Sequence, residues 1–356
     1  MSQTISRPHR LGINCVPVYY AGGKKIAQFR SGDEPARGPE DWVGSTAALP
    51  AALLASADPT AGISHLEDGT LLRDAVRDDP TGWLGPDLGR ALSDGEIGVL
   101  VKLLDAGERL PVHCHPSRES AKRLLGSRFG KTEGWAVMDA DKGSSVWLGF
   151  SRDLDHAQLA RMIAAQDVDS MLASMNRVEV RTGDILYVPA GTPHAIGSGV
   201  FLTELQEPTS FSILAEYASF GLDEGQATLG LGWETAITCF NFEAFAGDEA
   251  GSIVRRPERL ITAKGGAIDR LFPVEADDYF RAFRLAVEPD ISFDVLGYRV
   301  LIVTAGEAEL EFGTGGPNVV VREGDTWALP FGTGELRAVG RAELVIAMPP
   351  AHISPE

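Results

Sequence analysis

One twelve-residue pattern occurs twice in this chain and limits its fold more than any other feature. Residues 183–194 and residues 324–335 both read Gly-Asp, four variable residues, Pro, one variable residue and then Gly-Thr, so five of the twelve positions match. Around both copies lie short β-forming runs, separated by Gly and Pro at the spacing of an antiparallel barrel or jelly roll. A repeat of this kind indicates a repeated structural unit. We therefore expect a mainly β protein built from two related β-barrels.

The length of 356 residues agrees with two domains, since it exceeds what one ordinary core requires. We place the first domain at residues 1–255 and the second at residues 256–356. The first domain is expected to carry helical insertions, which lie near residues 46–95, 117–125 and 153–175. The expected strands are 99–104, 110–115, 134–138, 145–150, 177–180, 185–188 and 200–205 in the first domain, and 280–287, 298–305, 307–312, 319–321, 326–329 and 342–347 in the second.

The charge balance argues against two kinds of partner. The formal net charge is −18 and the pI is about 4.8, so the long-range field opposes nucleic acid and anionic membrane surfaces. No apolar run approaches the length of a membrane span. Three cysteines without CxxC spacing fit reduced thiols better than disulfides. We expect a cytoplasmic protein with no nucleic-acid or membrane partner.

Two short segments of the first domain together fit one metal ion. His113 and His115 lie two residues apart on an expected strand, so both project from the same face while Cys114 points the other way. Glu133 can return on a neighbouring strand, and His194 follows the Pro-x-Gly turn of the first repeat copy. Three imidazoles and one carboxylate suit Zn²⁺, although Mn²⁺, Fe²⁺, Co²⁺ or Ni²⁺ also bind such sets.

The second repeat copy lacks these groups. It has Glu335 at the position of His194, and no His-x-His segment precedes it. The first barrel is therefore expected to hold one divalent metal ion, and the second none.

The same residues resemble a known family, the class I mannose-6-phosphate isomerases of the cupin superfamily, and in particular its short bacterial members. The resemblance covers nearly the whole chain and is densest from residue 97 to residue 206. The segments that carry it are Gly22-Gly23-Lys24-Lys25, Glu40-Asp41-Trp42, Leu100 to Leu104, Gly130-Lys131-Thr132-Glu133-Gly134-Trp135 and Val188-Pro189-Ala190-Gly191-Thr192-Pro193-His194-Ala195-Ile196-Gly197. It implies two cupin-type jelly-roll barrels, the second metal-free, and a metal-dependent aldose–ketose isomerase that works through an enediol.

The chain departs from the family pattern at the metal and at the phosphate. The family ligands are Gln, His, Glu and His, and His113 stands at the Gln position. A family serine associated with phosphate is Pro111 here, and the downstream arginine corresponds to Ile213. A family aspartate is replaced by Thr209. Because phosphate recognition relies on bidentate arginine and charge-assisted hydrogen bonds, we expect weaker binding of a phosphorylated sugar.

The resemblance also suggests which residues move protons. Glu204, ten residues beyond His194, is the first candidate for general acid–base catalysis, and Lys131 is the second. Lys131 is also the cation that remains for a phosphate oxygen.

Several alternatives stay open at this point. The substrate is a sugar phosphate or an unphosphorylated sugar or sugar derivative. A cupin oxygenase could use the same ligands to hold iron, and a sugar-sensing protein could keep the pocket without turnover. The exact sugar, the native metal and the oligomeric state are not determined by the sequence.

Overall fold

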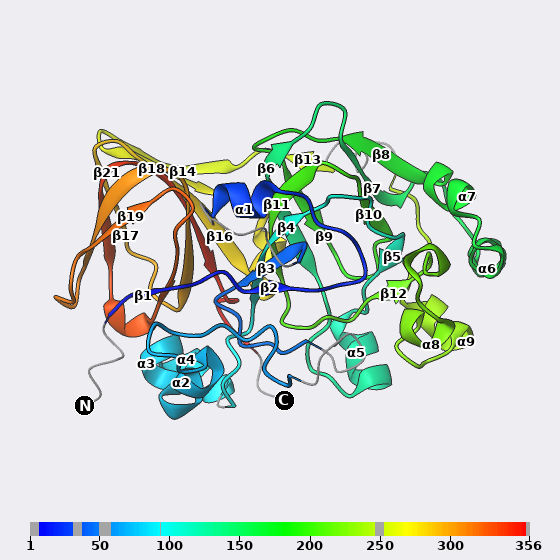
Figure 1. Cartoon of the computed structure of the whole chain (residues 1–356), viewed down its shortest axis with the longest axis horizontal. Coiled ribbons are helices and arrows are strands. Elements are labelled where there is room, and N and C mark those ends of the chain that lie inside the picture. The colour runs from blue at the N-terminus through cyan, green and yellow to red at the C-terminus, as the bar shows by residue number, and fades with distance from the viewer. Residues whose placement is uncertain (1–6, 31–37, 50–57, 93, 246–252, 354–356) are drawn as a thin grey trace.

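The computed structural model describes residues 7–30, 38–49, 58–92, 94–245 and 253–353 (Figure 1). It contains three sheets, and every pairing between the named strands is antiparallel. Two of the sheets build the first barrel, and the third builds the second barrel. The mainly β fold with two barrels is therefore confirmed.

The first barrel consists of a seven-stranded and a five-stranded sheet. The seven-stranded sheet has the order β13-β9-β6-β11-β4-β3-β2 and the five-stranded sheet the order β12-β5-β10-β7-β8. Their strands are β2 (Cys15–Val16), β3 (Glu40–Val43), β4 (Leu100–Asp105), β6 (Glu133–Ala140), β9 (Ile185–Val188), β11 (Val200–Gln206) and β13 (Val254–Arg255), then β5 (His113–Cys114), β7 (Ser145–Phe150), β8 (Met175–Glu179), β10 (His194–Ile196) and β12 (Ile213–Leu214).

The second barrel is one nine-stranded sheet. Seven of its strands follow the order β1-β20-β18-β21-β16-β15-β14, and the other two are β17, which pairs with β21, and β19, which pairs with β18. Its strands are β1 (His9–Arg10), β14 (Glu258–Ala263), β15 (Gly266–Arg270), β16 (Arg281–Val287), β17 (Asp290–Phe293), β18 (Arg299–Phe312), β19 (Val319–Arg322), β20 (Thr326–Leu329) and β21 (Leu336–Met348). Two separate strands expected at 298–305 and 307–312 form the single strand β18, because a register shift between Val303 and Ala305 lets the ladder continue.

Helices lie outside the barrels, mostly where insertions were expected. They are α1 (Lys25–Phe29), α2 (Leu72–Asp78), α3 (Pro80–Leu84), α4 (Pro86–Ala91), α5 (Arg118–Leu125), α6 (His156–Ala165), α7 (Val168–Ala173), α8 (Glu224–Ala227) and α9 (Trp233–Ala236). Ser117 caps α5 by accepting a hydrogen bond from the Ser120 amide, and Asp155 forms a capping box with Gln158 at α6. Part of the 46–95 insertion, residues 50–57, lies outside the described residues. Within the described part of the chain, no helix is long and apolar enough to cross a membrane.

The two repeat copies form the same turn. In the first barrel the Gly183 amide donates to the Val137 carbonyl, and the Val137 amide donates to the Asp184 carbonyl, at 2.8 and 2.9 Å. In the second, Gly324, Val303 and Asp325 make the equivalent pair of bonds, both at 3.0 Å. The match in sequence therefore reflects a shared backbone arrangement.

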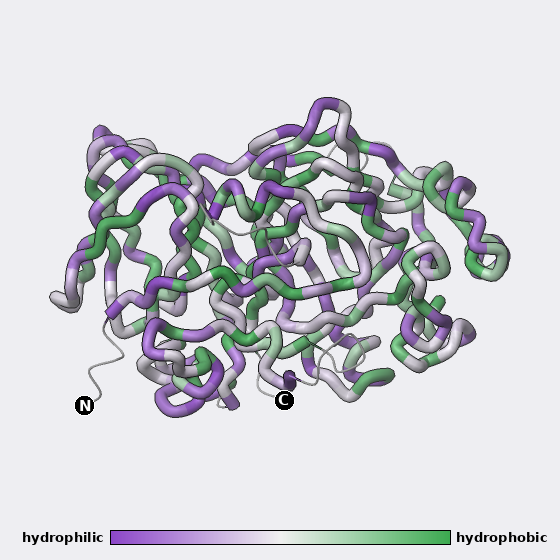
Figure 2. The backbone as a smooth tube through the Cα atoms, in the orientation of Figure 1, coloured by the Kyte–Doolittle hydropathy of each residue, from purple (hydrophilic) through white to green (hydrophobic). Residues whose placement is uncertain are grey.

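The barrels pack against each other through one hydrophobic cluster. It joins Val101 and Phe201 of the first barrel to Phe280, Val300 and Ile302 of the second. In Figure 2 the hydrophobic segments follow the strands inside both barrels, and hydrophilic segments are frequent in the outer loops. The expected boundary after residue 255 falls between β13 and β14, but β1 pairs with β20 and so joins the second sheet. The division at 255/256 stays a prediction.

Candidate metal centre and active site

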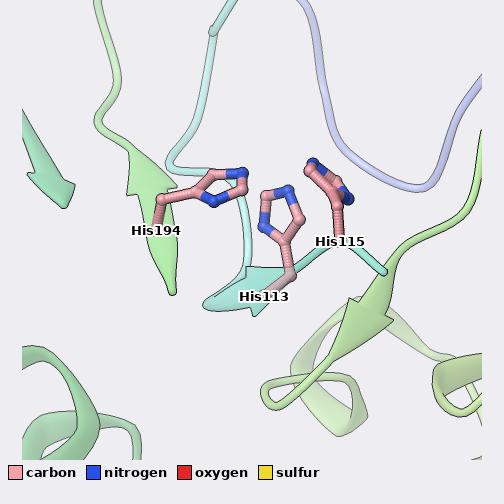
Figure 3. A group of neighbouring side chains, drawn as sticks. All are labelled: His113, His115 and His194. Carbon is pink, nitrogen blue, oxygen red and sulfur yellow. The ribbon is translucent and has the colours of Figure 1, made fainter. Parts of the chain in front are cut away.

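Three histidines meet inside the first barrel. His113 and His194 face each other in register on β5 and β10, and His115 follows directly after β5. Their ring nitrogens lie within 4.8 Å of one another, and all three side chains are buried. Figure 3 shows the three rings turned toward a common region. Cys114, as expected from strand alternation, lies in the hydrophobic cluster on the other face of the sheet.

The backbone fixes the tautomer of each ring. The Nδ1 atoms of His113, His115 and His194 lie 2.8, 2.8 and 2.9 Å from the carbonyl oxygens of Pro111, Phe211 and Thr192. A carbonyl can only accept, so each Nδ1 carries the hydrogen and each Nε2 presents a lone pair. This arrangement orients imidazoles for a metal ion.

Glu133 approaches the histidines from the opposite sheet. Its Oε2 lies 3.1 Å from His115 Nε2 and its Oε1 lies 3.2 Å from His194 Nε2. The Trp135 indole donates to Oε1 at 3.1 Å, and the Lys131 ammonium donates to Oε2 at 2.9 Å. Trp135 is fully buried.

The geometry fits a divalent cation. His194 Nε2 is buried and has no hydrogen-bond partner in the part of the chain that the structure describes, and its lone pair faces a carboxylate oxygen. Two electron-rich atoms in contact are unfavourable unless a cation lies between them. Lys131 Nζ donates to His115 Nε2 at 2.7 Å, so a metal ion bound to His115 would compete with Lys131 for that lone pair.

Burial and neighbouring charges give these groups the protonation states that a metal requires. Burial, together with the adjacent His194, holds the pKa of His113 well below its usual value, and burial and Lys131 lower the pKa of His115 to about 3. Burial opposes ionisation of Glu133, but Lys131 and the imidazoles outweigh it and hold the pKa of that carboxyl well below its usual range. These shifts favour neutral rings for His113 and His115 and an ionised carboxylate for Glu133.

A row of buried charges continues from the histidines across the seven-stranded sheet. Glu204 on β11 lies 3.4 Å from the Lys102 ammonium through Oε2 and 3.9 Å from the Lys131 ammonium through Oε1. Lys102 lies 3.1 Å from Glu40 Oε2. Glu40 also accepts hydrogen bonds from the Tyr20 hydroxyl at 2.5 Å and the Trp42 indole at 2.7 Å. Negative and positive groups thus alternate along the row.

Glu204, the central carboxyl of this row, has an unusually high pKa. Burial raises the pKa of Glu204 to about 8; Lys102 opposes this shift and Glu133 adds to it. For Lys102, burial favours the neutral amine, but Glu204 and Glu40 outweigh burial and raise its pKa.

One cavity of about 550 Å³ lies beside these groups, and its lining includes two of the three histidines, His113 and His194, together with Glu40. Its polar lining includes His113, Glu133, Lys131, Glu204 and Lys102, and its apolar walls include Tyr19, Leu49, Leu125, Phe211 and Leu222. The cavity is large enough for a sugar and presents both carboxylates and ammonium groups to it.

The sequence analysis did not single out Glu40 or Lys102 as candidate site residues. A signal for Lys102 existed, because it is the single charged residue in the apolar run 99–104. A lysine there must find a buried partner, but the sequence does not show which strand supplies it.

Pro111, Ile213 and Thr209, the three departures from the family pattern, make different contacts in the structure. The Pro111 carbonyl is the acceptor that orients His113. The Ile213 side chain was expected in the place of a phosphate-binding arginine, but it packs in the core with Cys114. Its neighbours Ser212 and Leu214 line the cavity instead. Thr209 donates to the Gly130 carbonyl at 2.6 Å.

The fold and this centre define the class as a two-barrel cupin with a candidate metal site in the first barrel. No family model matches the chain. In sequence it is 40% identical over 109 residues to the mannose-6-phosphate isomerase of Streptococcus mutans serotype c, a match that covers 31% of this chain and 33% of that protein. It is 28% identical over 258 residues to mannose-6-phosphate isomerase ManA of Bacillus subtilis, covering 72% and 76% of the two chains.

Solved structures of the same group share the fold along nearly the whole chain. The mannose 6-phosphate isomerase of Bacillus subtilis has a TM-score of 0.73 at 20% identity and covers 96% of this chain and 99% of its own. A putative mannosephosphate isomerase of Archaeoglobus fulgidus has a TM-score of 0.72 at 18% identity, with 97% and 98% covered. The resemblance to the mannose-6-phosphate isomerases is thus confirmed in sequence and in fold.

Proposed function

We propose that this protein is a metal-dependent aldose–ketose isomerase. The observation that carries the proposal is a buried group of side chains: three imidazoles converge beside Glu133, and a second buried carboxyl, Glu204, lies between two lysines at the adjoining cavity. The relatives named mannose-6-phosphate isomerase support this reaction class over the oxygenase alternative. Oxygen uptake by iron-loaded protein tests that alternative directly.

His113, His115 and His194, through Nε2, and the Glu133 carboxylate would hold the metal ion. When bound, a divalent ion, with Zn²⁺ as our first expectation and Mn²⁺, Fe²⁺, Co²⁺ or Ni²⁺ as alternatives, supplies a Lewis acid for the negative charge that develops on sugar oxygens.

Glu204 is the group that we assign to proton transfer. The reaction removes a proton from one carbon of the sugar and returns it to the next, and a carboxylate performs both steps if it stays close to both carbons. Lys102, on β4, forms an ion pair with one oxygen of Glu204. Lys102 also forms an ion pair with Glu40. Lys131 lies between Glu204 and Glu133, where its ammonium can donate hydrogen bonds to sugar oxygens.

The cavity lining favours a second candidate substrate, an unphosphorylated sugar or sugar derivative. No arginine lines the cavity among the described residues, and both of its lysines already contact carboxylates. A phosphate dianion would therefore lack the bidentate partner that it usually has.

A panel assay distinguishes the two substrates. Purified, metal-loaded protein is incubated with free aldoses, free ketoses and their 6-phosphates, and kcat/KM is compared for each. Turnover of any aldose–ketose pair supports the isomerase proposal. Much faster turnover of mannose 6-phosphate than of every free sugar would reject the second candidate, and no turnover of any member would reject the isomerase and favour a sugar-sensing role.

A further inference from the structure

An arginine of the second barrel occupies the position that Glu133 holds in the first. Glu133 begins β6 and pairs with Val188, the last residue of β9. Arg299 begins β18 and pairs with Leu329, the last residue of β20. Both residues also lie four positions before the valine that bonds the Gly-Asp turn, Val137 in the first barrel and Val303 in the second. The strand pairing and the turn therefore share one register in both barrels, and this register superposes Arg299 on Glu133.

The Arg299 side chain is fully buried. It shares its face of β18 with Leu301 and Val303, which belong to the core of the second barrel. Its Nη2 donates to Thr333 Oγ1 and to the Gly334 carbonyl, both at 2.7 Å. Its Nε and Nη1 are buried and have no hydrogen-bond partner among the described residues.

No carboxylate neutralises this guanidinium within the part of the chain that the structure describes. Arg299 takes part in no ion pair there, and burial alone lowers its pKa, to about 10. Trp327, on the neighbouring strand and in the same core, likewise has a buried indole N–H without a partner. A buried cation with unpaired donors is strongly unfavourable, so such groups are normally matched by an anion.

We propose that the second barrel binds a small inorganic anion, a halide or a phosphate-like oxyanion, through Nε and Nη1 of Arg299. The first barrel gathers lone pairs and a carboxylate, which suit a cation. The second barrel places an arginine and N–H donors at the equivalent position, which suit an anion. The repeat thus carries two sites of opposite charge.

Bromide tests the site directly. Crystals of the full chain are soaked in sodium bromide and measured at the bromine absorption edge. We expect an anomalous peak in hydrogen-bonding contact with Arg299 Nε or Nη1. Its absence from this position, with peaks elsewhere or none, overturns the proposal for halides, and the same experiment with phosphate, read from ordinary density, decides for oxyanions.

A solution assay separates specific binding from general salt effects. The melting temperature is followed as bromide, or in a second series phosphate, replaces a bulky sulfonate at constant ionic strength, since a ligand of the native state raises it. Arg299→Met should weaken the apparent anion affinity by about 10-fold or more, because it removes a charged hydrogen-bonding partner. Arg299→Lys, which keeps the charge and is easier to accommodate, should give an intermediate affinity.

Arg337→Met is the matched control, since Arg337 belongs to the same barrel but is exposed and paired with Asp290 and Glu311. It should retain the wild-type anion dependence. Equal anion dependence in wild type, Arg299→Met and Arg299→Lys contradicts the proposal.

Discussion

The two barrels share a backbone turn but bury residues of opposite charge. Each closes a Gly-Asp turn with the same pair of main-chain hydrogen bonds, to Val137 in the first and to Val303 in the second. At equivalent strand positions the first barrel buries Glu133, and the second buries Arg299. The turn chemistry thus specifies the shape of the barrel, whereas a few interior positions specify its chemistry.

In the first barrel, further buried groups hold the side chains of the candidate site in place. Backbone carbonyls orient the three imidazoles, Trp135 and Lys131 hold Glu133, and Lys102 with Glu40 holds Glu204. In the second barrel the interior is mostly apolar, and its core includes Leu301 and Val303, which share a strand face with Arg299. This contrast predicts that substitutions in the first barrel change metal binding and activity, and that equivalent turn substitutions affect both barrels alike.

The largest effect is expected for removal of a metal ligand. His194→Ala deletes one of the three Nε2 atoms that converge, so we expect nearly complete loss of bound metal and of isomerase activity. Metal analysis of purified protein measures the first, and a coupled sugar assay the second. His156→Ala is the control, because His156 stacks on Phe242 away from the cavity and should leave metal content unchanged. Stoichiometric metal in His194→Ala would refute the assignment.

Removal of the proposed proton-transfer group should be nearly as severe for turnover but not for metal. Glu204→Gln keeps the size of the side chain and removes its capacity to take a proton, so kcat should fall by about 10²-fold or more while metal stays bound. Glu179→Gln, at an exposed position of β8, serves as the control. A near-normal rate in Glu204→Gln would remove Glu204 from the mechanism.

A smaller effect is expected for a residue that supports a ligand. Trp135→Phe keeps the packing but removes the N–H that Glu133 Oε1 accepts, so metal affinity should fall by roughly 10–100-fold. Competition with a chelator of known affinity measures it. Trp147→Phe is the matched control, since Trp147 is a half-buried residue of β7 that packs beside Arg177. If both variants lose the same affinity, the Trp135 hydrogen bond does not support the site.

Much of this arrangement follows from local sequence, and the rest depends on long-range pairing. The alternation of His113 and His115 and the turn before His194 are local, and the structure brings the three histidines together as expected. The partner of Lys102 is set by the register of β4 with β3 and β11, which brings Glu40 and Glu204 to it from distant segments. No local pattern encodes that register.

Two further features lay beyond the sequence for similar reasons. The strand β1 crosses to the second barrel because of tertiary pairing with β20, not because of its own residues. Ile213 packs in the core with Cys114, which the sequence could not show, because it does not give the face of a two-residue strand.

The smallest effect is expected for substitutions in the Gly-Asp turn that the two barrels share. Asp184 and Asp325 each accept a hydrogen bond from the amide three residues before, at 2.8 and 2.9 Å. Replacing either by Ala removes this hydrogen bond to a charged acceptor and also an ion pair with an exposed arginine, Arg256 for Asp184 and Arg10 for Asp325. Because ion pairs with exposed partners contribute little, each variant should lose about 1–3 kcal/mol of stability. Melting temperatures measure the loss, and metal content should be kept in Asp325→Ala because its turn lies in the second barrel, outside the centre formed by His113, His115 and His194. A large loss for one aspartate and none for the other would show that the turns, despite their common bonds, do not stabilise the two barrels in the same way.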